Sequence, residues 1–137
     1  LRQMEYMIEV ACAIILGADG RVLAAQRSGA MSMPDKWEFP GGKLEQGESA
    51  ESCLVREIRE ELDVEVRVIE ALEPNIHSYA STTIRLIPFT CRIVLGEIRL
   101  REHRACRWVR PGELLALDWA EADIPCVINF LRKISAS

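Results

Sequence analysis

The stretch GGKLEQGESAESCLVREIREELDV, residues 41–64, carries seven carboxylates and only three cations behind a Gly-Gly step. From Ser49 to about Leu62 it predicts a helix, because Ser49 is a suitable N-cap and an acidic residue stands in the first turn. Leu54, Ile58 and Leu62 form an apolar stripe that can face a core. The stretch therefore predicts one amphipathic helix whose outer surface is strongly acidic.

Three of these carboxylates, Glu57, Glu60 and Glu61, stand at helical spacings of three and four and project from adjoining parts of one surface. Like-charge pairs at these spacings repel by roughly a few tenths of a kcal/mol each. Arg56 and Arg59 can relieve part of the repulsion, and a divalent metal relieves it better, since Mg²⁺ and Mn²⁺ prefer hard oxygen ligands. Helix geometry alone leaves two interpretations open, a solvated surface and a metal site.

The spacing upstream of the helix favours the metal site. Five residues separate Gly42 from Glu48, and seven more separate Glu48 from REIREE at 56–61. This pattern resembles the Nudix box, the signature of the Nudix (MutT-like) hydrolases. The box is written G-x5-E-x7-R-E-U-x-E-E-x-G-U, where x is any residue and U is a bulky aliphatic one. Every fixed position matches except the last glycine, where Asp63 precedes Val64. Glycine suits a left-handed residue after a helix, and Asp adopts that conformation at modest cost. The resemblance extends over nearly the whole chain.

The rest of the chain predicts strands around this helix. We expect strands at 8–16, 21–27, 37–39, within 64–80, at 83–96 and at 105–110, and further helices at 111–117 and about 121–134. The GADG turn predicts that the first two strands form a hairpin. This order predicts an α/β protein, and the resemblance implies the Nudix fold, a mixed β-sheet sandwiched between α-helices (α/β/α) in a single domain, residues 1–137.

Composition limits the class of protein. The net charge of −4 and the absence of a long apolar run or a signal-peptide layout predict a cytoplasmic protein that binds neither a nucleic acid polymer nor a membrane. Monomer and homodimer both remain open, as does the N-terminus, where either Met7 is the natural start or Leu1 to Tyr6 are native. Five scattered cysteines predict buried free thiols: Cys12, Cys53, Cys91, Cys106 and Cys126.

The resemblance implies a Mg²⁺-dependent pyrophosphohydrolase, with Mn²⁺ as a substitute, which converts a nucleoside triphosphate and water to the monophosphate and pyrophosphate. The implied metal ligands are the helix carboxylates, one backbone carbonyl and an acid from a loop before Trp108: Gly41, Glu57, Glu60, Glu61 and Glu102. The implied catalytic residues are Arg56, Glu57, Glu60 and Glu102. Glu57 is the expected base and Glu102 the alternative, while Arg56 would orient Glu57 and Glu48 would hold the loop in shape.

Substrate contacts are implied for residues near the box and in the C-terminal part: Arg27, Glu38, Phe39, Lys43 and Asp123. The segment WEFPGGK (37–43) has the form typical of MutT-like members, and its Lys43 would approach the phosphates. Arg27 matches a phosphate-contacting position of this group, with an ordinary surface role as the alternative. For Phe39 and Trp37, core packing is the alternative to contact with the base.

Base choice depends on the C-terminal segment LDWAEADIPCV, residues 117–127, which resembles the corresponding stretch of CTP-preferring members. Asp123 stands where MutT reads a purine with an asparagine, unless it serves only as a helix N-terminal charge. An ionised aspartate accepts hydrogen bonds without donating, which suits cytosine N4. This favours CTP, dCTP or a modified dCTP. 8-Oxo-dGTP, another nucleoside diphosphate derivative and a non-catalytic nucleotide sensor are alternatives. Trp119 and Tyr79 are candidates for stacking on the base or for core and rim positions.

Four other titratable residues are expected to have ordinary roles. Glu45 and Glu51 are interpreted as solvated or helix-start charges. His77 and His103 are isolated histidines, which are more often incidental than catalytic.

Overall fold

The computed structural model describes residues 7–136, so the first six residues, whose native status the sequence leaves open, lie outside it. The elements are β1 (Met7–Ile15), β2 (Val22–Gln26), β3 (Trp37–Glu38), β4 (Gly41–Lys43), α1 (Ala50–Leu62), β5 (Glu65–Ala71), β6 (Asn75–Ser78), β7 (Thr83–Leu95), β8 (Ala105–Val109), the 3-10 helices η1 (Pro111–Ala116) and η2 (Glu121–Asp123), and α2 (Ile124–Ser135). None of the helices formed by these residues is long and apolar enough to cross a membrane.

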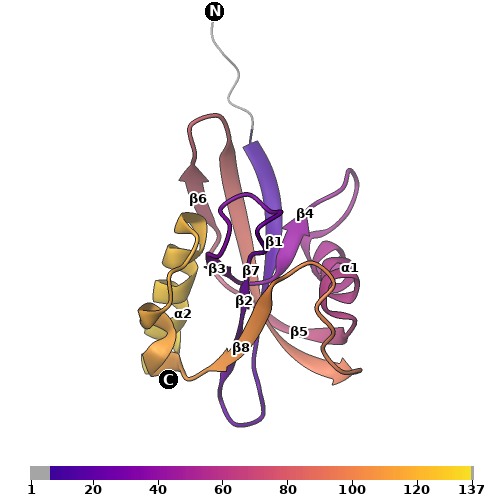
Figure 1. Ribbon diagram of the computed structural model, residues 1–137, viewed down its shortest axis with the longest axis vertical. Coiled ribbons are helices and arrows are strands. Elements are labelled where there is room, and N and C mark those ends of the chain that lie inside the picture. The colour runs from indigo at the N-terminus through magenta and orange to yellow at the C-terminus, as the bar shows by residue number, and fades with distance from the viewer. Residues whose placement is uncertain (1–6, 137) are drawn as a thin grey trace, which may run out of the picture.

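A mixed sheet runs through the middle of the domain. Its order is β4-β1-β7-β5, with β6 also paired to β7, and the central pair β1 and β7 is parallel while the other pairs are antiparallel. Figure 1 shows α1 and α2 on opposite sides of this sheet. The predicted α/β fold, a mixed sheet between helices, is confirmed.

The first two strands do not make the predicted hairpin. The turn closes with a hydrogen bond from the Gly17 N–H to the Arg21 carbonyl at 2.8 Å, but β2 then pairs with β3 and β8 in a second, three-stranded antiparallel sheet. The side chains of β2 from Val22 to Ala25 are completely buried. A strand buried on both faces needs cover from two sides, and β2 obtains it by leaving β1 and lying between the two cores.

Residues 64–80 hold two strands where one was predicted. β5 pairs with the C-terminal part of β7, and β6 pairs with its N-terminal part. Pro74 stands between them and has no N–H to donate to a continuous ladder, so the chain breaks there. Two helix predictions also change in detail: residues 111–116 form a 3-10 helix, and the last α-helix begins at Ile124 after the short η2.

The core is divided in two by β1, as its continuous apolar run predicts. Ala11, Ala13 and Ile15 face the side of α1, whereas Cys12 and Ile14 belong to the cluster on the side of α2. The predicted apolar stripe of α1, Leu54, Ile58 and Leu62, is completely buried against the first of these faces. Each such side chain contributes about 1.5–3 kcal/mol of burial free energy. This packing orients the acidic surface of α1 outward.

Both ends of α1 are capped as the sequence predicts. The Ser49 side chain accepts a hydrogen bond from the Ser52 N–H at 3.1 Å. Asp63 takes the left-handed conformation (φ 60°, ψ 31°), and its N–H donates to the Arg59 carbonyl. The prediction about the cysteines is also confirmed, because all five are free thiols and only Cys106 is more than slightly exposed.

Candidate active site

The loop before α1 is held by one arginine. Nε and Nη2 of Arg56 donate to the two carboxylate oxygens of Glu48, both at 2.8 Å, and Glu48 also accepts from the Glu45 N–H at 3.0 Å. These bonds lower the pKa of Glu48 to about 2, with the hydrogen bonds from Arg56 as the main cause. The arrangement fits the expectation that Glu48 fixes the shape of the loop.

The same arginine also reaches the helix carboxylates. Its Nη1 lies 2.9 Å from Glu57 and 3.4 Å from Glu60. The Glu57 carboxylate is packed against Gly42, since a Cβ added there would stand 2.3 Å from the Glu57 Cδ. Burial raises the pKa of Glu57, an effect that Arg56 opposes and that Glu60 and Glu102 reinforce. Arg56 therefore holds Glu57 in one place, while Glu60 is largely exposed beside it.

Glu61 is a buried carboxylate with an unmet need for a partner. The residue is only 5% exposed, and its Oε2 has no hydrogen-bond partner among the described residues. Burial raises the pKa of Glu61 to about 9, reinforced by the negative charges of Glu38, Glu57 and Glu102 and opposed by the backbone N–H of Gly41. A buried acid in this state is costly unless a cation neutralises it.

The carboxylates around Glu61 suit a divalent cation without forming a finished ligand set. The charges of Glu57 and Glu102 raise the pKa of Glu61, and the charge of Glu102 also raises the pKa of Glu57, so these acids share one negative environment. Within residues 7–136, no three His, Cys, Asp or Glu side chains are gathered closely enough to hold a metal by themselves. Since the donors are hard oxygens and one of them is orphaned, Mg²⁺ or Mn²⁺ fits this set better than a softer metal.

A cavity of about 250 Å³ opens beside these carboxylates. It is lined by every predicted substrate-binding residue, namely Arg27, Glu38, Phe39, Lys43 and Asp123. Two predicted metal ligands, Gly41 and Glu61, also line it, as do Met31, Met33 and Tyr79. Glu61 is the side chain that connects the acidic surface of α1 to this cavity. The sequence-predicted sites for metal and substrate are thus adjacent.

Asp123 does not have the environment on which the cytosine argument rested. It is only 7% exposed, and its Oδ2 accepts a hydrogen bond from the Phe39 N–H at 2.8 Å. Burial, and secondarily the charge of Glu38, raises the pKa of Asp123 to about 8. Burial thus favours the protonated form, in which Asp123 can donate as well as accept. The environment of Asp123 in the protein without substrate does not support the expectation of an ionised, acceptor-only aspartate.

Arg27 is engaged inside the cavity wall. It donates to Glu38, to the Ser32 carbonyl at 2.5 Å and to the Ser32 hydroxyl at 3.0 Å. Glu38 in turn lies 2.8 Å from Nε2 of His103, which the sequence did not single out as a site residue. The sequence carried one weak signal for His103, its position directly after Glu102.

The aromatic candidates separate into core and cavity. Trp119 is buried against Phe39, with ring centroids 4.8 Å apart, and its indole N–H donates to the Leu114 carbonyl at 2.7 Å. Of the alternatives left open for Trp119, the structure supports the core position. Tyr79 lines the cavity, and its hydroxyl accepts from the Ala122 N–H at 3.2 Å. Phe39 does both, since its ring packs in the core while the residue lines the cavity.

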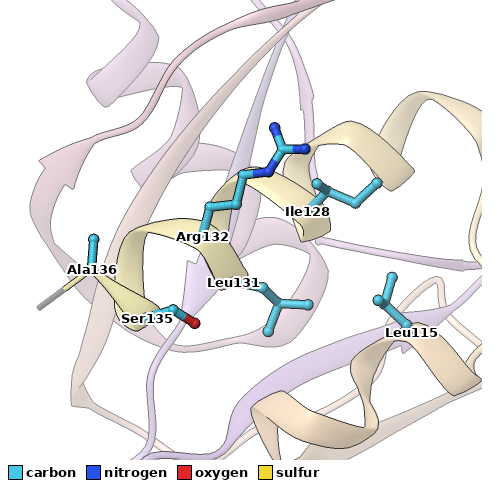
Figure 2. Close-up of a pocket in the computed structure, with 6 residues that line it drawn as sticks. All are labelled: Leu115, Ile128, Leu131, Arg132, Ser135 and Ala136. Carbon is cyan, nitrogen blue, oxygen red and sulfur yellow. The ribbon is translucent and has the colours of Figure 1, made fainter.

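A second hollow lies between η1 and α2, away from the acidic surface. Figure 2 shows Leu115 of η1 facing Ile128 and Leu131 of α2, with Arg132 at the side. Of its six lining residues only Arg132 is charged, and all of them lie outside the set that the sequence assigns to metal or substrate. The predicted site residues that line a hollow are thus found in the cavity next to α1 and not in this one.

Mg²⁺ is expected to raise the Tm of the protein, and Glu61→Gln is expected to lose most of that increase. A bound cation would replace the proton that burial favours on Glu61 and give the orphaned Oε2 a partner, whereas the neutral amide of glutamine offers the cation no negative charge. Thermal unfolding with EDTA and with Mg²⁺ measures the difference. Glu51→Gln, a change in the exposed first turn of the same helix, should keep the full increase. Equal increases in wild type and Glu61→Gln would contradict this assignment of Glu61.

Comparison with known proteins agrees with the geometry. The NUDIX domain model matches residues 6–130. CTP pyrophosphohydrolase of Escherichia coli (strain K12) is 39% identical over 125 residues, 91% of this chain and 92% of that protein. The 8-oxo-dGTP diphosphatase of the same strain is 27% identical over 125 residues, 91% of this chain and 97% of that protein.

A solved structure extends the likeness to three dimensions. The solution structure of the E. coli ORF135 protein has a TM-score of 0.84 and 37% sequence identity, and the match covers 96% of this chain and 94% of that one. The family model spans nearly all of the domain. The chain therefore belongs to the Nudix family, as a MutT-like pyrophosphohydrolase that acts on small nucleotides.

Proposed function

We propose that this protein is a Mg²⁺-dependent nucleoside triphosphate pyrophosphohydrolase that prefers CTP, dCTP or a modified dCTP and releases pyrophosphate. One observation carries the proposal. The buried carboxylate of Glu61, with its orphaned oxygen, stands between the Arg56-held Glu57 and the cavity that contains Asp123. A metal-assisted phosphoryl site and a base-sized cavity thus share one wall.

The carboxylates Glu57, Glu60, Glu61 and Glu102 and the carbonyl of Gly41 would hold the metal. When bound, Mg²⁺ supplies polarisation of the phosphoryl oxygens and lowers the pKa of an attacking water. Glu57 would accept a proton from the attacking water, because Arg56 fixes its carboxylate at 2.9 Å; Glu102 is the alternative base. Arg56 is thus a positioning residue for the base.

Lys43 is the better of the two candidates for contact with the phosphates. It lies on the exposed end of β4 and lines the cavity. Arg27 would have to give up bonds to Glu38 or Ser32 before it could reach a phosphate. We therefore assign phosphate contact to Lys43, and to Arg27 the support of the cavity wall.

Asp123 can contact a base in more than one way. A protonated carboxyl donates from one oxygen and accepts at the other, which matches N3 and the N4 amine of cytosine. The same pattern matches O6 and the N7–H of 8-oxoguanine, so 8-oxo-dGTP is the second candidate. Sequence identity does not separate the two candidates, since the chain is 39% identical to the E. coli CTP pyrophosphohydrolase and 37% identical to the "Putative 8-oxo-dGTP diphosphatase 2" of Mycobacterium tuberculosis (strain ATCC 25618 / H37Rv). The preference for cytosine rests on the resemblance of segment 117–127 to CTP-preferring members.

Release of pyrophosphate from a panel of nucleotides with Mg²⁺ tests the proposal. The panel contains CTP, dCTP, 5-substituted dCTP, 8-oxo-dGTP and the unmodified purine triphosphates, with ADP-ribose as a non-triphosphate, for which formation of AMP is the assay. Cytosine nucleotides should have the highest kcat/KM, and Glu60→Gln should be much less active on all of them. Preference for 8-oxo-dGTP would select the second candidate. No turnover of any compound would overturn the hydrolase proposal.

A further inference from the structure

His103 is a polar side chain buried at the edge of the active site. Its side chain has no exposed surface, and Nε2 lies 2.8 Å from a carboxylate oxygen of Glu38. Within residues 7–136 its Nδ1 has no hydrogen-bond partner. Burying an imidazole with only one of its two nitrogens hydrogen-bonded costs free energy. The question is therefore which part of the structure the one hydrogen bond of His103 keeps in place.

Glu38 is a firm anchor for this ring. Its other oxygen accepts from Arg27, and Arg27 is itself held by the carbonyl and the hydroxyl of Ser32. The Glu38 side chain is also largely buried, at 12% exposed. A ring that bonds to Glu38 is therefore bonded to a carboxylate that is already fixed on its opposite side.

The segment that carries His103 is otherwise tied down by its backbone. The N–H groups of Arg99 and Arg101 donate to the carbonyls of Leu62 and Glu61 at 2.9 and 3.1 Å, at the C-terminal end of α1. The N–H of Arg104 donates to the carbonyl at the end of β2 at 2.9 Å. Between these attachments, the His103 side chain supplies a link into the protein interior, towards β3.

Glu102 lies between Arg101, whose N–H bonds to the Glu61 carbonyl, and His103, whose side chain bonds to Glu38. It is exposed, and since the N–H of the preceding residue donates to the Glu61 carbonyl at 3.1 Å, its backbone lies beside the end of α1 that carries Glu61. Its negative charge also raises the pKa of Glu57 and of Glu61. An exposed glutamate on a nine-residue stretch outside helix and strand (96–104) has few contacts of its own to fix its direction. Of its two chain neighbours, His103 is buried whereas Arg101 is exposed.

We propose that His103 is a positioning residue: its buried hydrogen bond to Glu38 holds segment 96–104 in place and keeps Glu102 directed at Glu57 and Glu61. The inference rests on the proposed function, because it gives Glu102 a part in hydrolysis. It adds His103 to the residues that support hydrolysis, acting through Glu102 and without a contact of its own to nucleotide or metal.

Kinetics of two variants test this role. His103→Leu removes the hydrogen bond and should lower kcat about 10- to 100-fold while KM changes less than about threefold, since a misplaced catalytic group costs rate more than binding. His103→Gln, whose amide N–H reaches the position of Nε2, should restore most of kcat. His103→Asn, whose amide stops short of Glu38, repeats the comparison with matched polarity if the leucine variant folds poorly. Equal kcat in the Gln and Asn variants would overturn the proposal.

A double variant separates positioning from general stability. In the Glu102→Gln background, His103→Leu should lower kcat by less than about twofold further, because His103 acts through a carboxylate that is already absent. A further loss as large as in the wild type would show that His103 does not act through Glu102. Hydrogen exchange is the readout without turnover: amides of 99–104 should exchange faster in His103→Leu, and those of α1 should not. Unchanged exchange in 99–104 would also overturn the proposal.

Arg104→Gln is the matched control. It breaks an ion pair of 2.8 Å between the same segment and Asp35, but both side chains are more than half exposed, so little should depend on it. Its kcat should stay within about twofold of wild type; a loss equal to that of His103→Leu would mean that any weakening of the segment suffices. If the wild type hydrolyses no nucleotide, the proposed function fails. If it does and His103→Leu keeps full kcat, only this inference fails.

Discussion

Glu57→Gln is expected to lower kcat by about 10²–10⁴-fold, the range associated with loss of a general base. The Glu57 carboxylate is fixed by Arg56 at 2.9 Å and shares the acidic surface with Glu61 and Glu102, so the amide removes the proton acceptor without removing its setting. Because burial raises the pKa of Glu57, loss of its charge should not lower the Tm. Pyrophosphate release at saturating nucleotide and Mg²⁺ measures kcat.

Glu51→Gln provides the control on the same helix. Glu51 is an exposed acid in the first turn of α1, and we expect the kcat of the Glu51→Gln variant to remain within about twofold of wild type. The comparison divides the acidic stretch into catalytic and solvated parts. If the two variants lose activity equally, acid density as such matters and the assignment of Glu57 is wrong; if Glu57→Gln keeps full activity, Glu102 is the base.

Substitution of the two adjacent glycines by alanine is expected to have different effects: Gly41→Ala should lose stability, and Gly42→Ala should lose activity. At Gly41 a Cβ would stand 1.9 Å from the Ala11 carbonyl oxygen and 2.8 Å from the Cys12 Cα, both backbone atoms of the central strand β1. Backbone cannot yield without separating β4 from β1, so Gly41→Ala should lower the free energy of unfolding by about 3 kcal/mol or more.

Gly42→Ala should keep the fold and lose the activity. Its Cβ would stand 2.3 Å from Cδ of Glu57, the end of a side chain that can move aside. Movement takes the carboxylate away from Arg56, so kcat should fall towards that of Glu57→Gln while the free energy of unfolding changes by about 1 kcal/mol or less. Urea unfolding and pyrophosphate release measure both variants. Stable, active Gly41→Ala together with unfolded Gly42→Ala would contradict the placement of this loop.

The sequence predicted most reliably the features that depend on near neighbours. The Ser49 cap, the buried stripe of α1 and the left-handed Asp63 are confirmed. Each is decided within about four residues, because helix hydrogen bonds and side-chain contacts span that distance. The mixed sheet between helices followed from the order of the elements and from the resemblance to the Nudix family.

Features that depend on distant partners were less predictable. The turn after β1 is correct, but β2 pairs with strands that lie 11 or more residues away, as in the pairing of Gln26 with Trp37. Trp119 was a candidate for stacking, and it is a core residue because Phe39 and Leu114 enclose it. Sequence alone has no access to such choices, since any strand edge or apolar surface of suitable length could have been the partner.

The sequence by itself determined the box: which residues carry the acids, which arginine lies among them, and that they share one helix surface. Only the tertiary structure decided their states. It buried Glu61 with an orphaned oxygen, raised the pKa of Asp123 to about 8 and enclosed His103 against Glu38. The reason is physical: helix spacing is a local property of the backbone, whereas the cost of a charge depends on how much water the rest of the fold removes from it.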